Sequence, residues 1–244
     1  MIEPEHRPAY YSARSGGWRD WWTILHPPYT AWHLSYVVIG ACLAPHVDGG
    51  RLLMTLAAFF AAVGVAAHAL DELHGRPLRT TIPSRALVAA SAVGLAAAVA
   101  IGVVGVVEVG WVLLPFVIVG PVLALAYNLE WFGGFVHTDL GFALSWGAFP
   151  VITAYVAQTD TIRAAAVVAA VAATGLSLAQ RALSTPARTL RRRVGAVDGT
   201  MVHIDGTVTP ITHATLLAPL EFALRALSWS IVALAVALAV ARFG

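Results

Sequence analysis

The stretch that decides the fold is residues 86–107, ALVAASAVGLAAAVAIGVVGVV, in which no side chain carries a charge. A helix needs about 20 consecutive apolar residues to cross the hydrocarbon core of a bilayer, and this run is long enough. Similar apolar runs recur on both sides of it, at 30–46, 52–70, 109–128, 138–157, 162–182 and 215–241. The pattern predicts an all-α, polytopic bundle of about seven transmembrane helices.

The composition of the whole chain supports the same fold class. Of the 244 residues, 59% are hydrophobic and only 11% are charged, and the mean hydropathy is +0.76. Disordered proteins, coiled coils and sequence-reading nucleic-acid binders all need more polar or more basic surfaces. A disulfide scaffold is also excluded, because Cys42 is the single cysteine.

The distribution of arginine predicts how the bundle is oriented. All 15 basic residues are arginine. Most of them lie in the N-terminal arm and in the loops after the second and sixth spans, whereas Arg51, Arg163 and Arg242 lie at the opposite face. By the positive-inside rule, the N-terminus and these two loops are cytoplasmic, in an integral protein of the cell inner membrane. Seven crossings then put the C-terminus outside.

The two ends of the chain and the segment before the last span differ in composition from the rest of the predicted bundle. Residues 1–28 are polar, include Glu3 and Glu5, and contain Trp18, Trp21 and Trp22 beside Arg19, which is typical of a short interfacial helix rather than a signal peptide. Residues 29–193 are the predicted bundle and residues 215–244 the last helix. Between these two, residues 194–214 carry Asp198-Gly199 and Asp205-Gly206 among β-forming residues, which predicts a small cytoplasmic hairpin. It is either a flap over the cytoplasmic face or a plain connector.

Ionisable side chains cluster at the cytoplasmic end of the second span. His68, Asp71 and Glu72 fall on one helical face, with Gly75 beside them, and we expect the three to point together into the bundle. Such a group could hold a hard cation such as Mg²⁺, whose other ligands would be water and substrate phosphate oxygens. The alternative is an ordinary helix end that meets water, although this does not explain His68, which lies one turn deeper.

A second cluster follows the sixth span. Arg181 and Arg188, interleaved with hydroxyl side chains, are candidates to bind a phosphate or diphosphate through bidentate hydrogen bonds. The run Arg191 to Arg193 is assigned instead to the membrane surface and to anionic lipid. In the last span, Glu221 and Arg225 are spaced i, i+4 and are expected to neutralise each other.

A third group of polar residues lies around the predicted loop before the fifth span. Tyr127, Asn128, His137 and Asp139 are expected to converge at the mouth of a pocket between the two charged clusters. The alternative is an interfacial aromatic and turn segment without a chemical role.

Three stretches of the chain resemble the UbiA superfamily of intramembrane prenyltransferases. They are Pro28-Tyr29-Thr30-Ala31-Trp32-His33-Leu34, the segment from Ala67 to Leu78 with its Arg-Pro-Leu, and the passage from Tyr127-Asn128 through Gly133-Gly134 and Pro150 to Gln158. Together they span about residues 26 to 193. The resemblance implies a UbiA-like bundle with a cytoplasmic pocket that binds a polyprenyl diphosphate through two aspartate-rich motifs and Mg²⁺ and transfers the prenyl group to an acceptor.

The resemblance also assigns roles to particular residues. Asp71 and Glu72 lie in the first aspartate motif, with His68 near its leading position. Arg76, Arg79, Trp32 and His137 are then further candidates for substrate binding. In place of the second motif stand Arg181 and Arg188, because no acidic residue occurs between Asp160 and Asp198.

The resemblance therefore implies a divergent isoprenoid transferase with one Mg²⁺ ion at most. The alternatives are an intramembrane terpene cyclase and a non-catalytic lipid-binding subunit.

Overall fold

The computed structural model describes residues 7–244 and is 75% helical. The first six residues of the predicted arm, with Glu3 and Glu5, lie outside the described part. The helical elements, in chain order, are α1 (Trp18–Ile24), α2 (Pro27–Cys42), α3 (Gly49–Phe59), η2 (Phe60–Ala67), α4 (His68–Leu73), α5 (Ser84–Val109), η3 (Trp111–Leu113), α6 (Leu114–Asn128), α7 (Trp131–Gly134), α8 (Asp139–Ala143), η4 (Leu144–Ala148), α9 (Phe149–Thr159), α10 (Ala164–Arg193) and α11 (His213–Phe243). The predicted all-α bundle is therefore present.

Six helical rods are long and apolar enough to cross a membrane, which supports an integral membrane protein. Within residues 7–244 they are Gly49–Leu73, Ser84–Val109, Trp111–Asn128, Asp139–Thr159, Ala164–Arg193 and His213–Phe243. The first predicted span corresponds to α2, which has only 16 residues. Pro45 follows its C-cap closely and disfavours helical backbone in the residue before it, so the helix stops short of residue 46.

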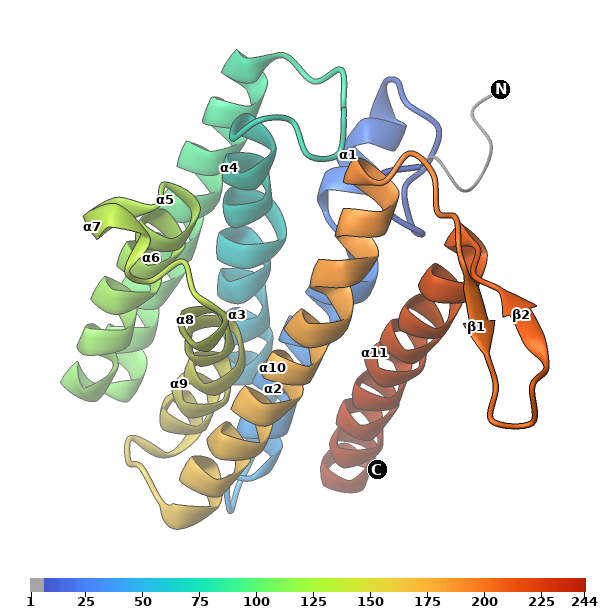
Figure 1. Ribbon diagram of the computed structural model, residues 1–244. Helices are drawn as coiled ribbons and strands as arrows, with labels where there is room; N and C mark the ends of the chain where they lie inside the picture. The colour runs from blue at the N-terminus through green and yellow to red at the C-terminus, as the bar shows by residue number, and fades with distance from the viewer. Residues whose placement is uncertain (1–6) are drawn as a thin grey trace.

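The long helices run side by side, with α1 and the C-terminal end of α11 at opposite ends of the bundle (Figure 1). α2 packs against α9 and α11, and α10 packs against α11. The last turn of α10, helix α1 and the end of α4 lie at one end of the bundle, which we call the arginine end (Figure 1).

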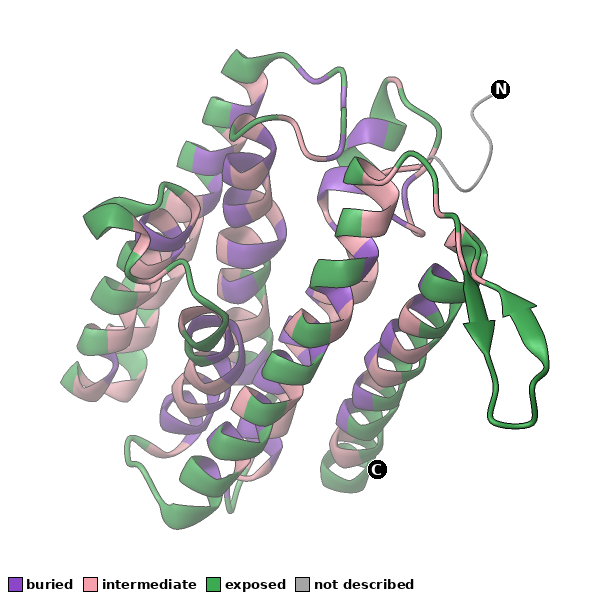
Figure 2. Cartoon of the chain, in the orientation of Figure 1, coloured by how far each residue is buried: buried purple, intermediate pink, exposed green. Residues whose placement is uncertain are grey.

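The outward faces of these helices are apolar. Exposed residues follow the outer surface of the bundle and buried residues face inward (Figure 2). Val107, Val171 and Trp229 are among the exposed large side chains. A soluble protein rarely exposes large apolar patches, whereas a bilayer solvates them.

The predicted hairpin is confirmed. Strands β1 (Thr200–Val202) and β2 (Val208–Pro210) pair antiparallel, with Met201 opposite Thr209. Both strands are exposed along their whole length and project away from the bundle beside α11 (Figure 1). The turn is held by Asp205, whose Oδ1 accepts hydrogen bonds from Thr207 N at 2.9 Å and from Thr207 Oγ1 at 2.7 Å.

Candidate functional site

A cavity of about 380 Å³ opens at the arginine end of the bundle. The arm, α2, η2, α4, α6, α8, η4, α10 and α11 all contribute to its wall. Its polar lining includes His26, His33, His68, Asp71, His74, Tyr127, Asn128, Glu130, His137, Gln180, Arg181, Ser184, Arg188, Arg191, Arg192, Arg193 and Glu221. The two charged clusters seen in the sequence therefore line one cavity.

Asp71 is the carboxylate that connects the two clusters. It lines the cavity together with His68, which lies one turn earlier. Arg188 and Arg192 from α10 lie close enough to interact with it electrostatically. The acidic end of the second predicted span and the arginine-rich end of the sixth thus face each other across the cavity.

Glu72 does not share this face, and the expectation that His68, Asp71 and Glu72 point together is wrong. Its side chain is fully buried. It accepts hydrogen bonds from Leu78 N at 2.9 Å, from Thr80 N at 2.9 Å and from Thr80 Oγ1 at 2.8 Å. The helix ends at Leu73 and the following loop folds back onto Glu72, so this carboxylate holds the loop and does not line the cavity.

Three residues predicted to bind substrate also lie outside the cavity lining. Arg76 donates to Ile82 O at 2.5 Å and to Ser84 Oγ at 2.7 Å, so it stabilises the loop before α5. Arg79, in the same loop, is exposed. Trp32 is fully buried in the core, where its Nε1 donates to Tyr36 OH at 2.6 Å.

Three members of the predicted loop group, Tyr127, Asn128 and His137, line the cavity, whereas Asp139 does not. The rings of Tyr127 and His137 stack with centroids 4.5 Å apart, and both line the cavity with Asn128. Asp139 lies at the start of α8 and is exposed, where it accepts a hydrogen bond from Arg181 Nε at 2.8 Å. Asp139 therefore positions the Arg181 guanidinium, which also lies over the Phe142 ring at 5.3 Å.

Of the three arginines that end α10, Arg191 and Arg192 are partly buried, whereas Arg193 is exposed, and their assignment to the membrane surface stays a prediction. Arg191 forms an ion pair with Glu221, and both side chains are less than 10% exposed. Glu221 therefore has a nearer partner than Arg225, whose Nη2 is 3.5 Å away. Arg192 and Arg193 line the cavity. Thirty residues of helix rise about 45 Å, so the end of α10 reaches beyond the bundle core and packs on the arm.

The N-terminal arm contributes cavity residues that were not predicted from the sequence. Arg191 Nη1 donates to Arg7 O at 3.3 Å and Arg192 Nε donates to Pro8 O at 3.2 Å, which holds the arm over the cavity. Tyr10, Tyr11 and His26 consequently line its wall. The only signal for this in the sequence was the cluster of aromatic residues before the turn at His26.

Some buried polar atoms of the wall have no hydrogen-bond partner within the described residues. They include Nε2 of His26 and Oε1 of Gln180, whose residues are 8% and 3% exposed. Buried polar atoms are almost always paired, and unpaired ones call for a ligand, ion or water. The cavity therefore offers unused hydrogen-bonding capacity as well as positive charge.

His26 makes the stability of the arm depend on pH. Its Nδ1 lies 2.5 Å from Tyr11 OH, and its ring stacks on His68 with centroids 4.3 Å apart. Burial, together with His68 and nearby arginines, lowers the pKa of His26 well below its ordinary value of 6.5. The folded protein thus holds this ring neutral, while the unfolded chain takes up a proton once the pH falls below 6.5.

We expect the free energy of unfolding to decrease below pH 6.5 by up to about 1.4 kcal/mol per pH unit from this residue. Thermal unfolding in detergent between neutral and acidic pH measures it. His26→Phe removes the titrating group, and its stability should change less with pH than that of the wild type. Identical slopes for the two proteins would contradict the assignment.

The side chains that line the cavity are poorly suited to hold a metal ion without further ligands. Among residues 7–244, no group of three His, Cys, Asp or Glu side chains is arranged to hold a metal. Glu72 accepts a hydrogen bond from its own loop, and Glu221 forms an ion pair with Arg191. Of the carboxylates in the lining, Asp71 and the exposed Glu130 remain, and Asp71 has guanidinium groups close to it. The residues present therefore do not fit a Mg²⁺ ion held by the protein alone.

The fold and the site define a class: a helical membrane protein with an arginine-rich, partly acidic cavity at one end of the bundle. Comparison with protein-family models, with characterised proteins and with solved structures found no match to the chain.

Proposed function

We propose that the protein is a membrane-embedded isoprenoid transferase of the UbiA-like kind and that it binds a polyprenyl diphosphate in this cavity, with the arginine end facing the cytoplasm. The observation that carries the proposal is the convergence of Arg181, Arg188 and Arg192 on a cavity whose wall also holds Asp71. Guanidinium groups bind phosphate oxygens bidentately, and three of them match the charge of a diphosphate.

The chemistry follows from where charge develops. The bond between C1 of the prenyl group and the diphosphate oxygen breaks, and its electron pair leaves with the diphosphate. The growing negative charge is stabilised by arginines that are already in place, which is the largest contribution that a fixed site makes. The resulting allylic cation forms a bond to a nucleophilic carbon of the acceptor, which then loses a proton.

His68 is suited to take that proton. Its Nδ1 lies 3.2 Å from the carbonyl oxygen of Gly64. With Nδ1–H donating there, Nε2 carries the free lone pair and can act as a base.

A non-catalytic lipid-binding subunit is the second candidate. The observation that favours it is the engagement of Glu72 by its own loop, which removes a carboxylate from the reacting centre. Such a protein binds the same diphosphate lipid and releases no free diphosphate, so a turnover assay separates the two functions.

Arg188→Ala tests the headgroup site. We expect farnesyl diphosphate to bind tenfold to a hundredfold more weakly, because a charge-assisted hydrogen bond contributes about 1.5–3 kcal/mol. Titration of the purified protein with farnesyl diphosphate measures the affinity for this ligand, and release of free diphosphate measures turnover.

Arg85→Ala is the matched control for this test. It removes the same charge at the same end of the bundle, from an exposed position outside the cavity. Equal affinities for the wild type and Arg188→Ala would defeat the proposal. Binding without release of diphosphate would favour the second candidate.

A further inference from the structure

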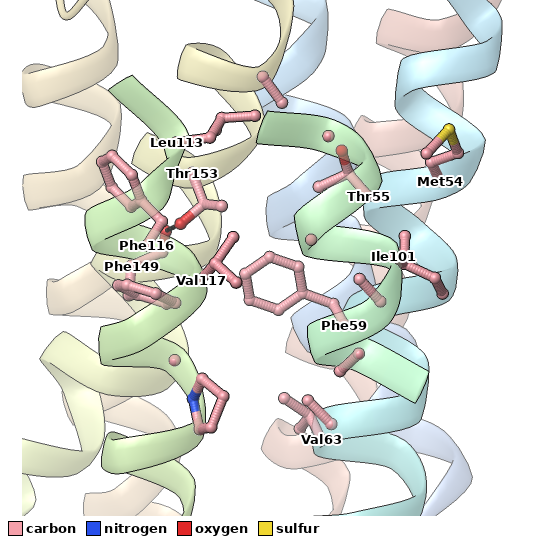
Figure 3. A pocket seen from close by; sticks show the side chains of 18 of the residues that line it. Met54, Thr55, Phe59, Val63, Ile101, Leu113, Phe116, Val117, Phe149 and Thr153 are labelled. Atoms are coloured by element: carbon pink, nitrogen blue, oxygen red, sulfur yellow. Dashed lines mark hydrogen bonds between the residues drawn. The ribbon is translucent and has the colours of Figure 1, made fainter. Parts of the chain in front are cut away.

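Exposed apolar side chains gather on the hairpin formed by β1 and β2. Apolar side chains of the helices have apolar surroundings: they face lipid or line the interior, as Phe59 and Val117 do in a hollow of about 110 Å³ (Figure 3). On the hairpin, Val202 is 73% exposed, Val208 is 60% exposed and Ile204 is fully exposed. Residues 7–244 bury none of these three side chains, and a group of them on a small element indicates an interaction surface.

The two faces of the hairpin differ in polarity. Side chains alternate between the faces along a strand, and residues that pair across the two strands share a face. Val202 pairs with Val208 on one face, which we call the valine face. Met201 pairs with Thr209 on the other, where Nε2 of His203 lies 2.8 Å from Thr209 Oγ1. The hairpin is therefore amphipathic.

The hairpin needs surroundings that are apolar on one side and hydrated on the other. A two-stranded hairpin is at best marginally stable in water unless one face is packed. The outer edges of the strands carry backbone groups that the hairpin does not pair, and such groups do not enter the hydrocarbon core. The carboxylate of Asp205 in the turn is excluded from the core as well. The headgroup boundary of a bilayer meets both requirements.

Helix α11 indicates where this boundary lies. Residues 226–241 carry no charge, and they follow directly on Arg225. The exposed Trp229 lies one turn after Arg225, and tryptophan is enriched at membrane interfaces. Arg225 lies twelve residues, or about 18 Å, from His213 at the start of α11. The first three turns of α11 therefore extend beyond the hydrocarbon core.

The hairpin is long enough to reach this boundary from the start of α11. Its base lies where Ile211 N donates to Gly199 O at 2.8 Å, two residues before α11 begins. From Gly199 to Asp205 an extended strand spans at most about 20 Å. The hairpin runs beside α11 from this base (Figure 1). Its turn can therefore lie at the level of Arg225.

The charge of the segment excludes attraction by anionic headgroups. No lysine or arginine occurs between Arg193 and Arg225, whereas Asp198 and Asp205 lie within the segment. Segments that bind anionic lipid carry clusters of basic residues. Contact of the hairpin with a bilayer would thus depend on its apolar surface.

We propose that the valine face lies on the bilayer surface at the headgroup boundary and that the hairpin holds the connection between α10 and α11 against the lipid. The partner is the apolar part of the lipid surface, whatever the headgroup charge. This inference goes beyond the proposed function, because it does not depend on what the cavity binds. A hairpin in this position leaves the cavity uncovered, in agreement with a cavity wall that includes none of its residues.

Adjacent cysteine variants on opposite faces of β1 test the proposal. Val202→Cys places a thiol on the valine face and Met201→Cys places one on the other face, and both positions are exposed, so neither substitution disturbs the bundle. Each thiol is labelled with an environment-sensitive fluorophore, and the wild type, whose Cys42 is buried, measures the background.

In phosphatidylcholine vesicles, we expect the label at position 202 to emit at a shorter wavelength than the label at 201. Lipids with a spin label near the headgroup should quench the label at 202, and aqueous iodide should quench the label at 201. Replacing part of the phosphatidylcholine with anionic phosphatidylglycerol should leave this pattern unchanged.

Four results would overturn the proposal. Equal quenching of both labels by iodide would place the hairpin in water, and equal quenching of both by lipid would contradict the assignment of the faces. A label at 202 that neither quencher reaches would assign the valine face to a protein surface. Quenching at 202 that requires anionic lipid would show that charge, and not apolar burial, brings the hairpin to the membrane.

Discussion

Replacing Arg191 with alanine is expected to lower the free energy of unfolding by about 3–5 kcal/mol, because it leaves the carboxylate of Glu221 buried without its main partner. The side chains of Arg191 and Glu221 are 8% and 9% exposed. Arg191 Nη2 donates to Glu221 Oε2 at 2.8 Å, and Arg191 Nη1 also donates to Arg7 O. The variant therefore loosens α11 and the arm together.

The measurement is thermal or denaturant unfolding of the purified protein in detergent. Arg225→Ala is the control, since Arg225 is more than half exposed and contacts Glu221 at 3.5 Å. It should cost at most about 1 kcal/mol, as exposed ion pairs do. A double variant, Arg191→Met with Glu221→Leu, removes both charges and should recover most of the stability. Equal stability of Arg191→Ala and Arg225→Ala would show that the buried pair contributes little.

The ion pair between Arg191 and Glu221 is a contact that local sequence patterns do not predict. The i, i+4 spacing of Glu221 and Arg225 predicts a pair within one helix. The preferred partner, Arg191, is 30 residues earlier in the chain. Only the packing of α10 on α11 brings Arg191 close, and that packing is a tertiary property without a local signature. The same is true of the arm, whose tyrosines reach the cavity through contacts with the end of α10.

The long helices and the hairpin could be predicted because they depend on interactions between residues that are close together in the sequence. The apolar run 86–107 becomes α5, Ser84–Val109, with two residues added at each end. Asp205-Gly206 lies in the turn of the antiparallel hairpin, as its turn preference predicts, and Asp198-Gly199 directly precedes β1. Asp71 and Arg188 reach one cavity because each lies at the same end of its helix in an alternating topology.

Helical spacing alone was not sufficient at the end of α4. Asp71 and Glu72 are adjacent, and spacing places both near the His68 face. The loop that follows decides between them, because the amide groups of Leu78 and Thr80 need an acceptor and Glu72 supplies it. A buried loop must satisfy its backbone groups, and this requirement outweighs the preference for a shared polar face.

Gly40→Leu is expected to cause the second large loss, about 3 kcal/mol or more in the free energy of unfolding. A Cβ atom at Gly40 would lie 2.3 Å from the carbonyl oxygen of Val151 and 2.9 Å from its Cα. These are backbone atoms of α9, which no side-chain rotation can move aside. The two helices would have to separate, and α2, which carries the cavity residue His33, would lose its close packing against α9.

Gly175→Leu is the matched control, because nothing lies within 4 Å of the Cβ position at Gly175. Both glycines lie inside helices and no local sequence signal separates them, so the prediction depends on the packing alone. Gly175→Leu should leave stability unchanged or raise it slightly, since leucine has the higher helix propensity. Comparison of the free energies of unfolding of the two variants in the same detergent tests this prediction. If Gly40→Leu is as stable as Gly175→Leu, then α2 and α9 are not in the close contact on which the shape of the cavity depends.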